Sequence, residues 1–281
     1  MNPAVKSIQN KLLAYSRRRQ QNHQLTLIRF FQERFLYRLS MSAYGEAFLL
    51  KGGVLIYVFQ GVDSRPTRDI DFLAADSVRD QEAIVSACQA ICQIPCLEDY
   101  VLFDPNSITD QPLNALEKYP GTRIKLTATL GNITQRLQLD FGNGDQVYPL
   151  PNRITYPTLL DLPAPKLAVY PLETVLAEKL EAVVSLGEFN TRMKDFYDLY
   201  SLLEKHEVDQ RLLSEAIRRT FANRQAKQHP LRAIFSEAFR NNVQRNQNWV
   251  RFLDQAGIGA SLPFGYVLDQ IAMYLEPSYN D

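Results

Sequence analysis

Long hydrophobic runs are absent from this chain of 281 residues. No stretch of about 18 apolar residues occurs, so the sequence indicates no transmembrane helix. The first residues, MNPAVKSIQNKLLAYSRRR, contain neither a continuous apolar core nor a small-residue cleavage site, and they are unlike a secretory signal. We therefore expect a cytoplasmic protein that has no membrane partner.

Cysteine and histidine are scarce, with three residues of each. Cys88, Cys92 and Cys96 follow one another at intervals of four residues, and no histidine lies near them, which argues against a zinc site. We expect buried thiols that pack as small apolar side chains. The histidines are isolated in the sequence, and we expect surface positions for His23, His206 and His229.

The formal charge is zero, with 31 basic and 31 acidic residues, but the charges are unevenly distributed. Residues 1–40 and 211–251 are strongly basic, whereas residues 60–117 are mostly acidic. Basic surfaces beside an acidic site would suit a polyanion such as RNA. Solvated helix faces produce the same pattern, so both interpretations stay open.

The most informative stretch is Phe48 to Phe72, FLLKGGVLIYVFQGVDSRPTRDIDF. Alternate side chains share one face of a β-strand, so Asp69 and Asp71 are expected to project together while Ile70 and Phe72 enter the core. Two adjacent carboxylates repel each other unless a cation lies between them. Mg²⁺ is the natural candidate because it prefers hard oxygen ligands.

A pair of glycines, Gly52 and Gly53, precedes the apolar segment VLIYVF in this stretch. Glycine lets the backbone approach a ligand closely, and the free N–H groups at the start of a helix bind anions. The stretch therefore predicts a phosphate-binding turn followed by a metal-binding strand. An ordinary turn and a solvated strand edge are the alternatives.

Two motifs in this stretch carry a family resemblance. Lys51-Gly-Gly-x-Leu, followed by Arg65-x-Thr67-x-Asp-Ile-Asp-Phe, resembles the nucleotidyltransferase superfamily and, within it, the AbiEii/AbiGii toxin family. The resemblance implies a catalytic core similar to DNA polymerase β and a mostly helical C-terminal half. It also implies the toxin half of a bacterial toxin–antitoxin pair.

The second half of the family signature follows later in the chain, in the expected order. Glu178-Lys179 and then Arg192-x-Lys-Asp195-x-Tyr-Asp198-Leu resemble the remaining part of the AbiEii signature. The resemblance implies that Lys179 and Asp195 face the nucleotide site. Ion pairs within and between helices are the structural alternative for these charges.

The expected fold class is α+β, with a mixed-sheet nucleotidyltransferase core and a mostly helical C-terminal domain. Residues 4–40 have helical periodicity, a helix capped by Asp76 or Ser77 extends to about Gln93, and Trp249 belongs in a core. Strands are expected at 97–103, 123–130 and 133–141, with a hairpin turn at Gly131-Asn132. Six of the fifteen prolines lie in 148–171 and suggest an extended connector. The expected parts are an N-terminal helical segment 1–47, a catalytic core 48–150, a connector 151–171 and a helical domain 172–281.

A third carboxylate is expected near the first two. In QRLQLDFGNGD the apolar residues alternate with Gln138 and Asp140, so Asp140 should lie on the polar face near the end of a strand. A two-metal phosphoryl-transfer site would use it beside Asp69 and Asp71, although Asp145 could be confused with it.

The resulting hypothesis is an Mg²⁺-dependent transfer of NMP from an NTP to an acceptor hydroxyl, of which the tRNA 3′ end is one candidate. Asp69, Asp71 and Asp140 would hold metal, and Gly52 and Gly53 would receive the phosphates. The remaining candidates would contact the nucleotide or counter the charge on pyrophosphate: Lys51, Arg65, Thr67, Lys179 and Asp195. A non-catalytic relative that binds nucleotide or antitoxin, an enzyme that modifies protein, and a metal-dependent hydrolase are the alternatives.

Overall fold

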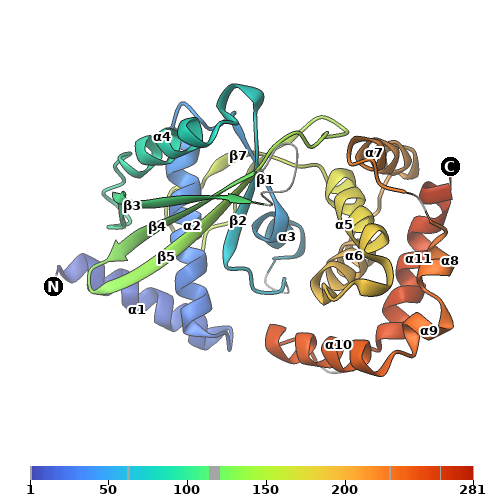
Figure 1. The fold of residues 1–281 in the computed structure, drawn as a ribbon. Coiled ribbons are helices and arrows are strands. Elements are labelled where there is room, and N and C mark those ends of the chain that lie inside the picture. The colour runs from blue at the N-terminus through green and yellow to red at the C-terminus, as the bar shows by residue number, and fades with distance from the viewer. Residues whose placement is uncertain (1, 62–63, 114–120, 228, 260, 281) are drawn as a thin grey trace. The chain divides into compact units, whose positions relative to one another are not determined.

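The computed structural model describes residues 2–61, 64–113, 121–227, 229–259 and 261–280. The chain forms two compact units (Figure 1). Unit 1 contains Met1–Val58, Pro66–Gly144 and Asn152–Val169, and unit 2 contains Phe59–Arg65, Asp145–Pro151 and Tyr170–Asp281. The units are therefore interleaved along the sequence.

A seven-stranded sheet in the order β3-β4-β5-β2-β1-β7-β6 is the centre of unit 1. β2 pairs with β5 and β1 with β7 in parallel, and the other pairs are antiparallel. This mixed sheet confirms the expected α+β class. The strands are β1 (Phe48–Lys51), β2 (Asp69–Ala74), β3 (Leu102–Leu113), β4 (Gly121–Leu130), β5 (Ile133–Gly142), β6 (Asn152–Thr155) and β7 (Lys166–Val169).

The hairpin of β4 and β5 forms as the sequence predicts. Gly131 has φ +63, a conformation that glycine adopts without steric cost, and Leu130 pairs with Ile133 across the turn. The strand expected at 97–103 is wrong except at its end, because β3 begins at Leu102. The buried Asp99 instead accepts the Val101 N–H at 2.9 Å and pairs with Arg38, which favours a turn there.

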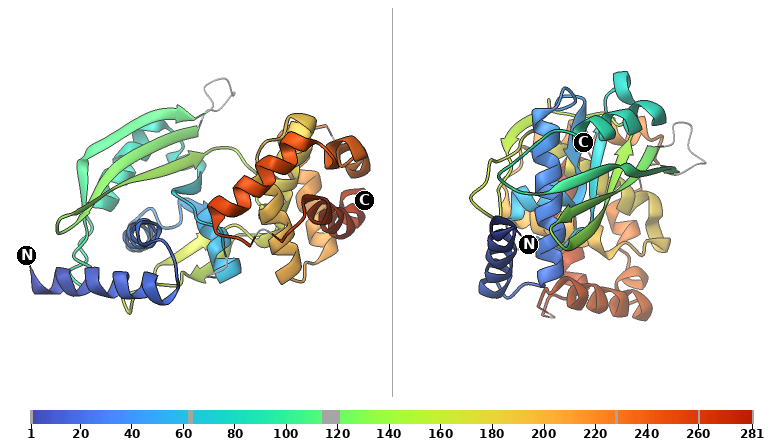
Figure 2. Two further views of the ribbon diagram at one scale, coloured as in Figure 1. Left: turned by 90° about the horizontal axis from the view of Figure 1, so that it is seen from below. Right: turned by 90° about the vertical axis from the view of Figure 1, so that its left-hand side faces the viewer.

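Three helices of unit 1 accompany the sheet: α1 (Pro3–Arg18), α2 (His23–Met41) and α4 (Gln81–Cys92). α2 contacts β5 and β7, and α4 contacts β3 and β4, so both helices cover one face (Figures 1 and 2). The single helix expected over 4–40 is divided, because Gln20 has φ +52 and the Asn22 side chain caps a new helix. The helix expected from Asp76 begins only at Gln81, after a 3₁₀ turn at Asp76–Val78.

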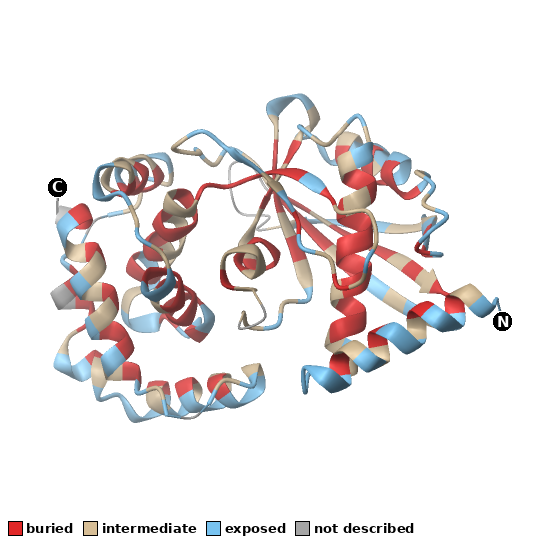
Figure 3. Cartoon of the chain, turned by 180° about the vertical axis from the view of Figure 1, so that it is seen from behind, coloured by how far each residue is buried: buried red, intermediate tan, exposed pale blue. Residues whose placement is uncertain are grey.

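The basic N-terminal segment contributes less surface charge than its composition suggests. α2 is buried on nearly all sides, as Figure 3 shows. Its Arg38 donates two hydrogen bonds to Asp99 at 2.8 and 3.0 Å, and its Arg34 lies 3.0 Å from Glu33. Burial raises the pKa of Glu33 to about 7, against the opposing effect of Arg34. These arginines therefore stabilise the interior of unit 1 and are not exposed to a polyanion.

Unit 2 is helical. Its core gathers aromatic rings: Phe264 lies 5.3 Å from Phe196 and 5.2 Å from Trp249 between ring centroids. Trp249 is thus in the core, as predicted. The helices are α5 (Leu172–Leu186), α6 (Met193–Lys205), α7 (Gln210–Asn223), α8 (Leu231–Ile234), α9 (Glu237–Arg240), α10 (Val243–Ala256) and α11 (Phe264–Asn280).

The proline-rich segment and the three cysteines also have defined positions in the fold. Residues 152–169, within the segment expected to be a connector, supply β6 and β7 to the sheet of unit 1. The thiols of Cys88 and Cys92 are buried, as expected, and that of Cys96 is partly exposed. Within the described residues, no helix has both the length and the apolar character needed to cross a membrane.

Candidate active site

Three carboxylates meet on neighbouring strands of unit 1. Asp69 and Asp71 lie on β2, and the parallel register places Asp140 of β5 directly opposite Asp71. Ile70 and Phe72, which alternate with the aspartates, are fully buried. Asp69, Asp71 and Asp140 each offer an oxygen atom that lies within 4.8 Å of the other two. The structure therefore brings together the three carboxylates that the sequence singled out.

This donor set fits a divalent cation. Three carboxylates so close together repel one another, and a bound cation would relieve that repulsion. All three donors are hard oxygen ligands of the kind that Mg²⁺ prefers. We call Asp69, Asp71 and Asp140 the carboxylate triad.

Arg123, which sequence reasoning missed, lies beside the triad. Its Nε donates to Asp140 Oδ1 at 2.8 Å and its Nη2 to Asp140 Oδ2 at 2.7 Å. The hydrogen bond with Asp140 raises the pKa of Arg123, and the charges of Asp69 and Asp71 act in the same direction. The signal was present in the sequence, because a two-residue turn at Gly131-Asn132 already places Arg123 opposite Asp140.

The glycine pair begins α3 (Gly52–Gln60) next to the triad. Gly52 has φ +66, and a Cβ atom there would lie 1.9 Å from Asp71 Oδ2. A Cβ atom on Gly53 would lie 2.6 Å from Thr67 Oγ1, whose hydroxyl donates to Asp69 Oδ1 at 2.9 Å. A side chain at either position would therefore displace Asp71 or Thr67 from its place in the site.

A second group of charges lies in unit 2, and its centre is the buried Asp198 on α6. Arg65 donates to both Asp198 oxygens at 2.8 Å, and Lys179 Nζ of α5 lies 2.6 Å from Asp198 Oδ2. Lys179 also donates to Asp195 Oδ1 at 3.0 Å, and Arg192 Nε lies 2.7 Å from Asp195 Oδ2. We call these five residues the α5–α6 charge cluster.

Electrostatics keep the centre of this cluster ionised. Burial opposes ionisation of Asp198, but the charges of Lys179 and Arg65 outweigh it, so the pKa of Asp198 lies below its usual value. Burial likewise disfavours the charged form of Lys179, yet Asp198 and Asp195 raise its pKa above the usual value. The cluster thus supplies its own counter-charges.

A family comparison covers the part of the chain that contains both groups of residues. The family described as "Nucleotidyl transferase AbiEii toxin, Type IV TA system" matches residues 34–270, which include the triad and the charge cluster. This chain belongs to the AbiEii family. It is therefore a nucleotidyltransferase of a toxin family from type IV toxin–antitoxin systems, and membership implies an NTP substrate and an antitoxin partner.

Solved structures share the fold of this AbiEii protein at low sequence identity. MenT4, a nucleotidyltransferase toxin from Mycobacterium tuberculosis H37Rv, is 14% identical with a TM-score of 0.63, and the match covers 96% of this chain and 90% of MenT4. A candidate nucleotidyltransferase from H. pylori is 12% identical with a TM-score of 0.57, over 92% of this chain and 96% of its own. A comparison with curated protein sequences found no match.

The predicted site residues of the AbiEii chain thus fall into two groups. Lys51, which is opposite Asp71 in the β1–β2 register, belongs to unit 1 together with Gly52, Gly53, Thr67 and the triad. Arg65, Lys179 and Asp195 belong to unit 2. Asp198, which sequence reasoning noticed but did not assign to the site, is the residue that joins the unit 2 group.

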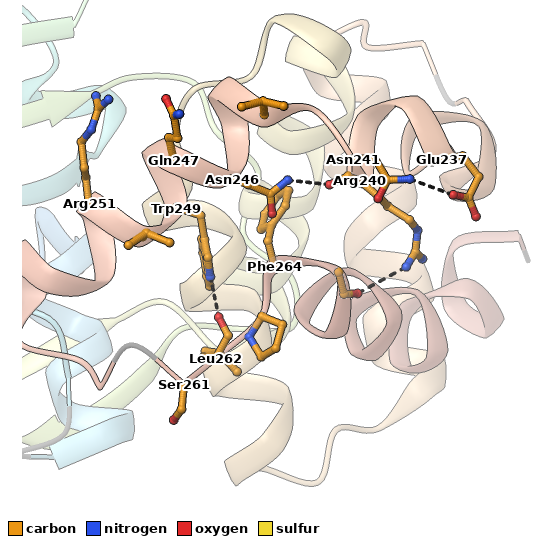
Figure 4. Close-up of a pocket in the computed structure, with 14 residues that line it drawn as sticks. Glu237, Arg240, Asn241, Asn246, Gln247, Trp249, Arg251, Ser261, Leu262 and Phe264 are labelled. Carbon is orange, nitrogen blue, oxygen red and sulfur yellow. Dashed lines mark hydrogen bonds between the residues drawn. The ribbon is translucent and has the colours of Figure 1, made fainter.

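Unit 2 also has a groove with a volume of about 1100 Å³ between α10 and residues 261–265 (Figure 4). Trp249 Nε1 donates to the Leu262 carbonyl oxygen at 2.8 Å, and Asn246 Nδ2 donates to the Arg240 carbonyl oxygen at 2.7 Å. Glu237 is the one acidic residue among those that line it. The groove therefore has no group of carboxylates comparable to the triad.

Proposed function

We propose that the protein transfers NMP from an NTP to an acceptor hydroxyl at the carboxylate triad, and that the acceptor is the 3′ end of an RNA such as tRNA. The observation that carries this proposal is the approach of three carboxylates to within 4.8 Å of one another beside a glycine-initiated helix. Family membership supports the reaction class.

Asp69, Asp71 and Asp140 would hold Mg²⁺ in this proposal. When bound, the ion would neutralise triphosphate oxygens and lower the pKa of the attacking hydroxyl. Thr67 and Arg123 would keep Asp69 and Asp140 in place, because each donates a hydrogen bond to one of these carboxylates. Held in this way, the carboxylates need little rearrangement before they bind metal.

The proposed step forms one bond and breaks one bond. The acceptor oxygen bonds to the α-phosphorus, the bond from the α-phosphorus to the bridging oxygen breaks, and pyrophosphate leaves. The hydroxyl proton passes to a carboxylate of the triad and then to water. The backbone N–H groups of Gly52 and Gly53, at the start of α3, would donate to phosphate oxygens.

The charge cluster has a part in the proposal through Lys179 and Asp195. An ammonium group has three N–H donors, and Asp195 and Asp198 engage the Lys179 group. We assign its remaining donor to an anionic ligand, with Asp195 orienting the ammonium. Arg65, which the sequence suggested for the same task, donates to both oxygens of Asp198 and would act by holding that residue.

The experiment is incubation of the purified protein with Mg²⁺, each α-labelled NTP in turn, and total bacterial RNA and protein, followed by a denaturing gel. A band of tRNA size with one NTP, which RNase destroys, is the expected result. Label that survives RNase but not protease would replace RNA by a protein acceptor. An absence of label with every NTP would contradict the proposed reaction.

A further inference from the structure

One face of the β4–β5 hairpin is polar along its whole length. Ile124 and Leu126 on β4, and Leu137 and Leu139 on β5, are buried. The side chains between them are wholly or partly accessible and belong to the opposite face, because neighbours along a strand alternate. Opposed pairs on this open face are Lys125 with Gln138, Thr127 with Arg136 and Thr129 with Thr134, and they continue the pair Arg123 with Asp140.

The open face begins at the triad. Asp140 marks one end, and Thr134 lies six residues before it on the same strand, a distance of about 20 Å at roughly 3.4 Å per residue. Between them lie the ammonium of Lys125 and the guanidinium of Arg136. A molecule that follows β5 over this face would therefore pass two cations before it reaches the carboxylates.

Both cations are available for an external anion. Arg136 is exposed and donates one long hydrogen bond, from Nη2 to Thr109 Oγ1 at 3.3 Å. Lys125 is partly exposed, and within the described part of the chain its ammonium makes no hydrogen bond or ion pair. The neighbouring β3 places the acidic Asp104 opposite Thr127, where its carboxylate accepts the Asn106 N–H at 2.9 Å.

We propose that this open face binds the single-stranded 3′ end of the RNA acceptor and leads its terminal hydroxyl to the triad. This proposal rests on the proposed function and names the residues that would bind its RNA acceptor. Lys125 and Arg136 would contact successive phosphates. Thr127, Thr129 and Gln138 offer hydrogen bonds to phosphate oxygens and 2′-hydroxyl groups.

The chemistry of the face favours an RNA strand over a protein segment. On β4 and β5 it presents only hydroxyl, amide and charged side chains, whereas protein interfaces depend on buried aromatic and apolar anchors. It also has no aromatic ring on these strands for base stacking. Binding should therefore depend strongly on salt and weakly on base sequence.

The test is a fluorescence-anisotropy titration of a fluorescein-labelled RNA hairpin with a short single-stranded 3′ end, without NTP. The double variant Lys125→Gln and Arg136→Gln should raise Kd about tenfold, as expected for the loss of two phosphate contacts. The slope of log K against log salt should become shallower by about 1.4, because each phosphate contact on a single strand contributes roughly 0.7.

The matched control is the double variant Arg153→Gln and Lys166→Gln. It removes one arginine and one lysine from β6 and β7, at the opposite edge of the same sheet, where both residues are exposed. Its Kd should equal that of the unchanged protein. Equal weakening in both double variants would mean that total charge alone matters and would overturn the proposal, as would wild-type affinity in the open-face variant.

A second measurement does not depend on substitutions. RNA with 4-thiouridine near its 3′ terminus should crosslink to peptides within residues 121–142, identified by mass spectrometry. Crosslinks confined to other segments would overturn the proposal. Because neither measurement uses NTP, RNA binding in the expected pattern without nucleotide transfer would contradict the proposed function while supporting this surface assignment.

Discussion

The carboxylate triad and the α5–α6 charge cluster both place acidic side chains next to basic ones, but their charge balance differs. The triad has three carboxylates, of which Asp140 pairs with Arg123 and Asp71 lies opposite Lys51 in the β1–β2 register. The cluster has two carboxylates, Asp195 and Asp198, and three cations. Carboxylates outnumber these cations in the first group, whereas cations outnumber carboxylates in the second.

This difference in charge balance leads to different expectations for the two groups. Closely spaced carboxylates gain from binding a cation, so the triad is suited to hold a divalent metal. A buried and fully paired group such as Asp198 resists any change, because removal of one partner leaves the others uncompensated. Substitutions in the triad should therefore affect chemistry, and substitutions at the centre of the cluster should affect folding.

The largest expected effect is on the reaction. Asp69→Asn with Asp71→Asn should lower nucleotide transfer by about a thousandfold or more, since two metal ligands are lost. The midpoint of thermal unfolding should not fall, because mutual repulsion is removed. Labelled-NTP transfer and calorimetry check both values. The control Asp76→Asn with Asp80→Asn removes the same charge from exposed positions after β2 and should transfer normally; transfer retained in the triad variant would contradict the mechanism.

For Asp198→Asn, in contrast, the main effect should be on the free energy of unfolding. Loss of this carboxylate leaves Lys179 and Arg65 without their main counter-charge in a buried setting, at a cost of about 3–5 kcal/mol in the free energy of unfolding. Urea denaturation measures the change. Glu215→Gln is the matched control: Glu215 pairs with Arg218 and Arg219 on the surface, and its replacement should leave the urea midpoint unchanged. Similar midpoints for both variants would remove the distinction between the two regions.

Gly52→Ala tests whether the triad depends on close backbone approach. The positive φ alone should cost roughly 1–2 kcal/mol, and the new Cβ would also displace Asp71. Gly257→Ala has the same kind of φ, +69, with open space around the new Cβ, so it should show the backbone cost without loss of transfer. A Gly52→Ala protein with normal transfer would show that Asp71 tolerates displacement.

The stability of the unchanged protein should fall more steeply in acid than the stability of the Asp198→Asn variant. The folded pKa of Asp198 lies below its unfolded value of about 3.9, so between these values the unfolded state binds more protons. Stability is therefore lost as the pH falls through this window. Urea midpoints measured at decreasing pH should decline more steeply in the unchanged protein than in Asp198→Asn. Parallel declines in the two proteins would show that Asp198 contributes nothing to the pH dependence of stability.

The smallest effect concerns Arg123. Arg123→Gln removes the guanidinium that pairs with Asp140, so the affinity for Mn²⁺, measured by calorimetric titration, should rise about fivefold. Arg79→Gln, which removes an exposed arginine paired with Asp76, should leave that affinity unchanged. Weaker Mn²⁺ binding in Arg123→Gln would mean that orientation of Asp140 matters more than its charge.

Local sequence features were sufficient to predict several structural features of this protein. Alternation placed Ile70 and Phe72 in the core and Asp69 and Asp71 together on the other face, and the hairpin turn at Gly131-Asn132 followed from its residue types. These features depend on neighbours along the chain, whose geometry is fixed by strand and turn conformations. The same is true of Gly52, which begins α3 as the motif predicted.

Tertiary structure decided what depends on partners far apart in sequence. Only the parallel pairing of β2 with β5 brings Asp140 opposite Asp71, and only tertiary packing places Lys179 and Arg65 on either side of the Asp198 carboxylate. Arg38 is a further example. It belongs to a basic segment of the sequence, yet it is buried and pairs with Asp99, which lies 61 residues away. A sequence specifies which side chains can pair, but the free energy of burying a charge depends on which partner the fold supplies.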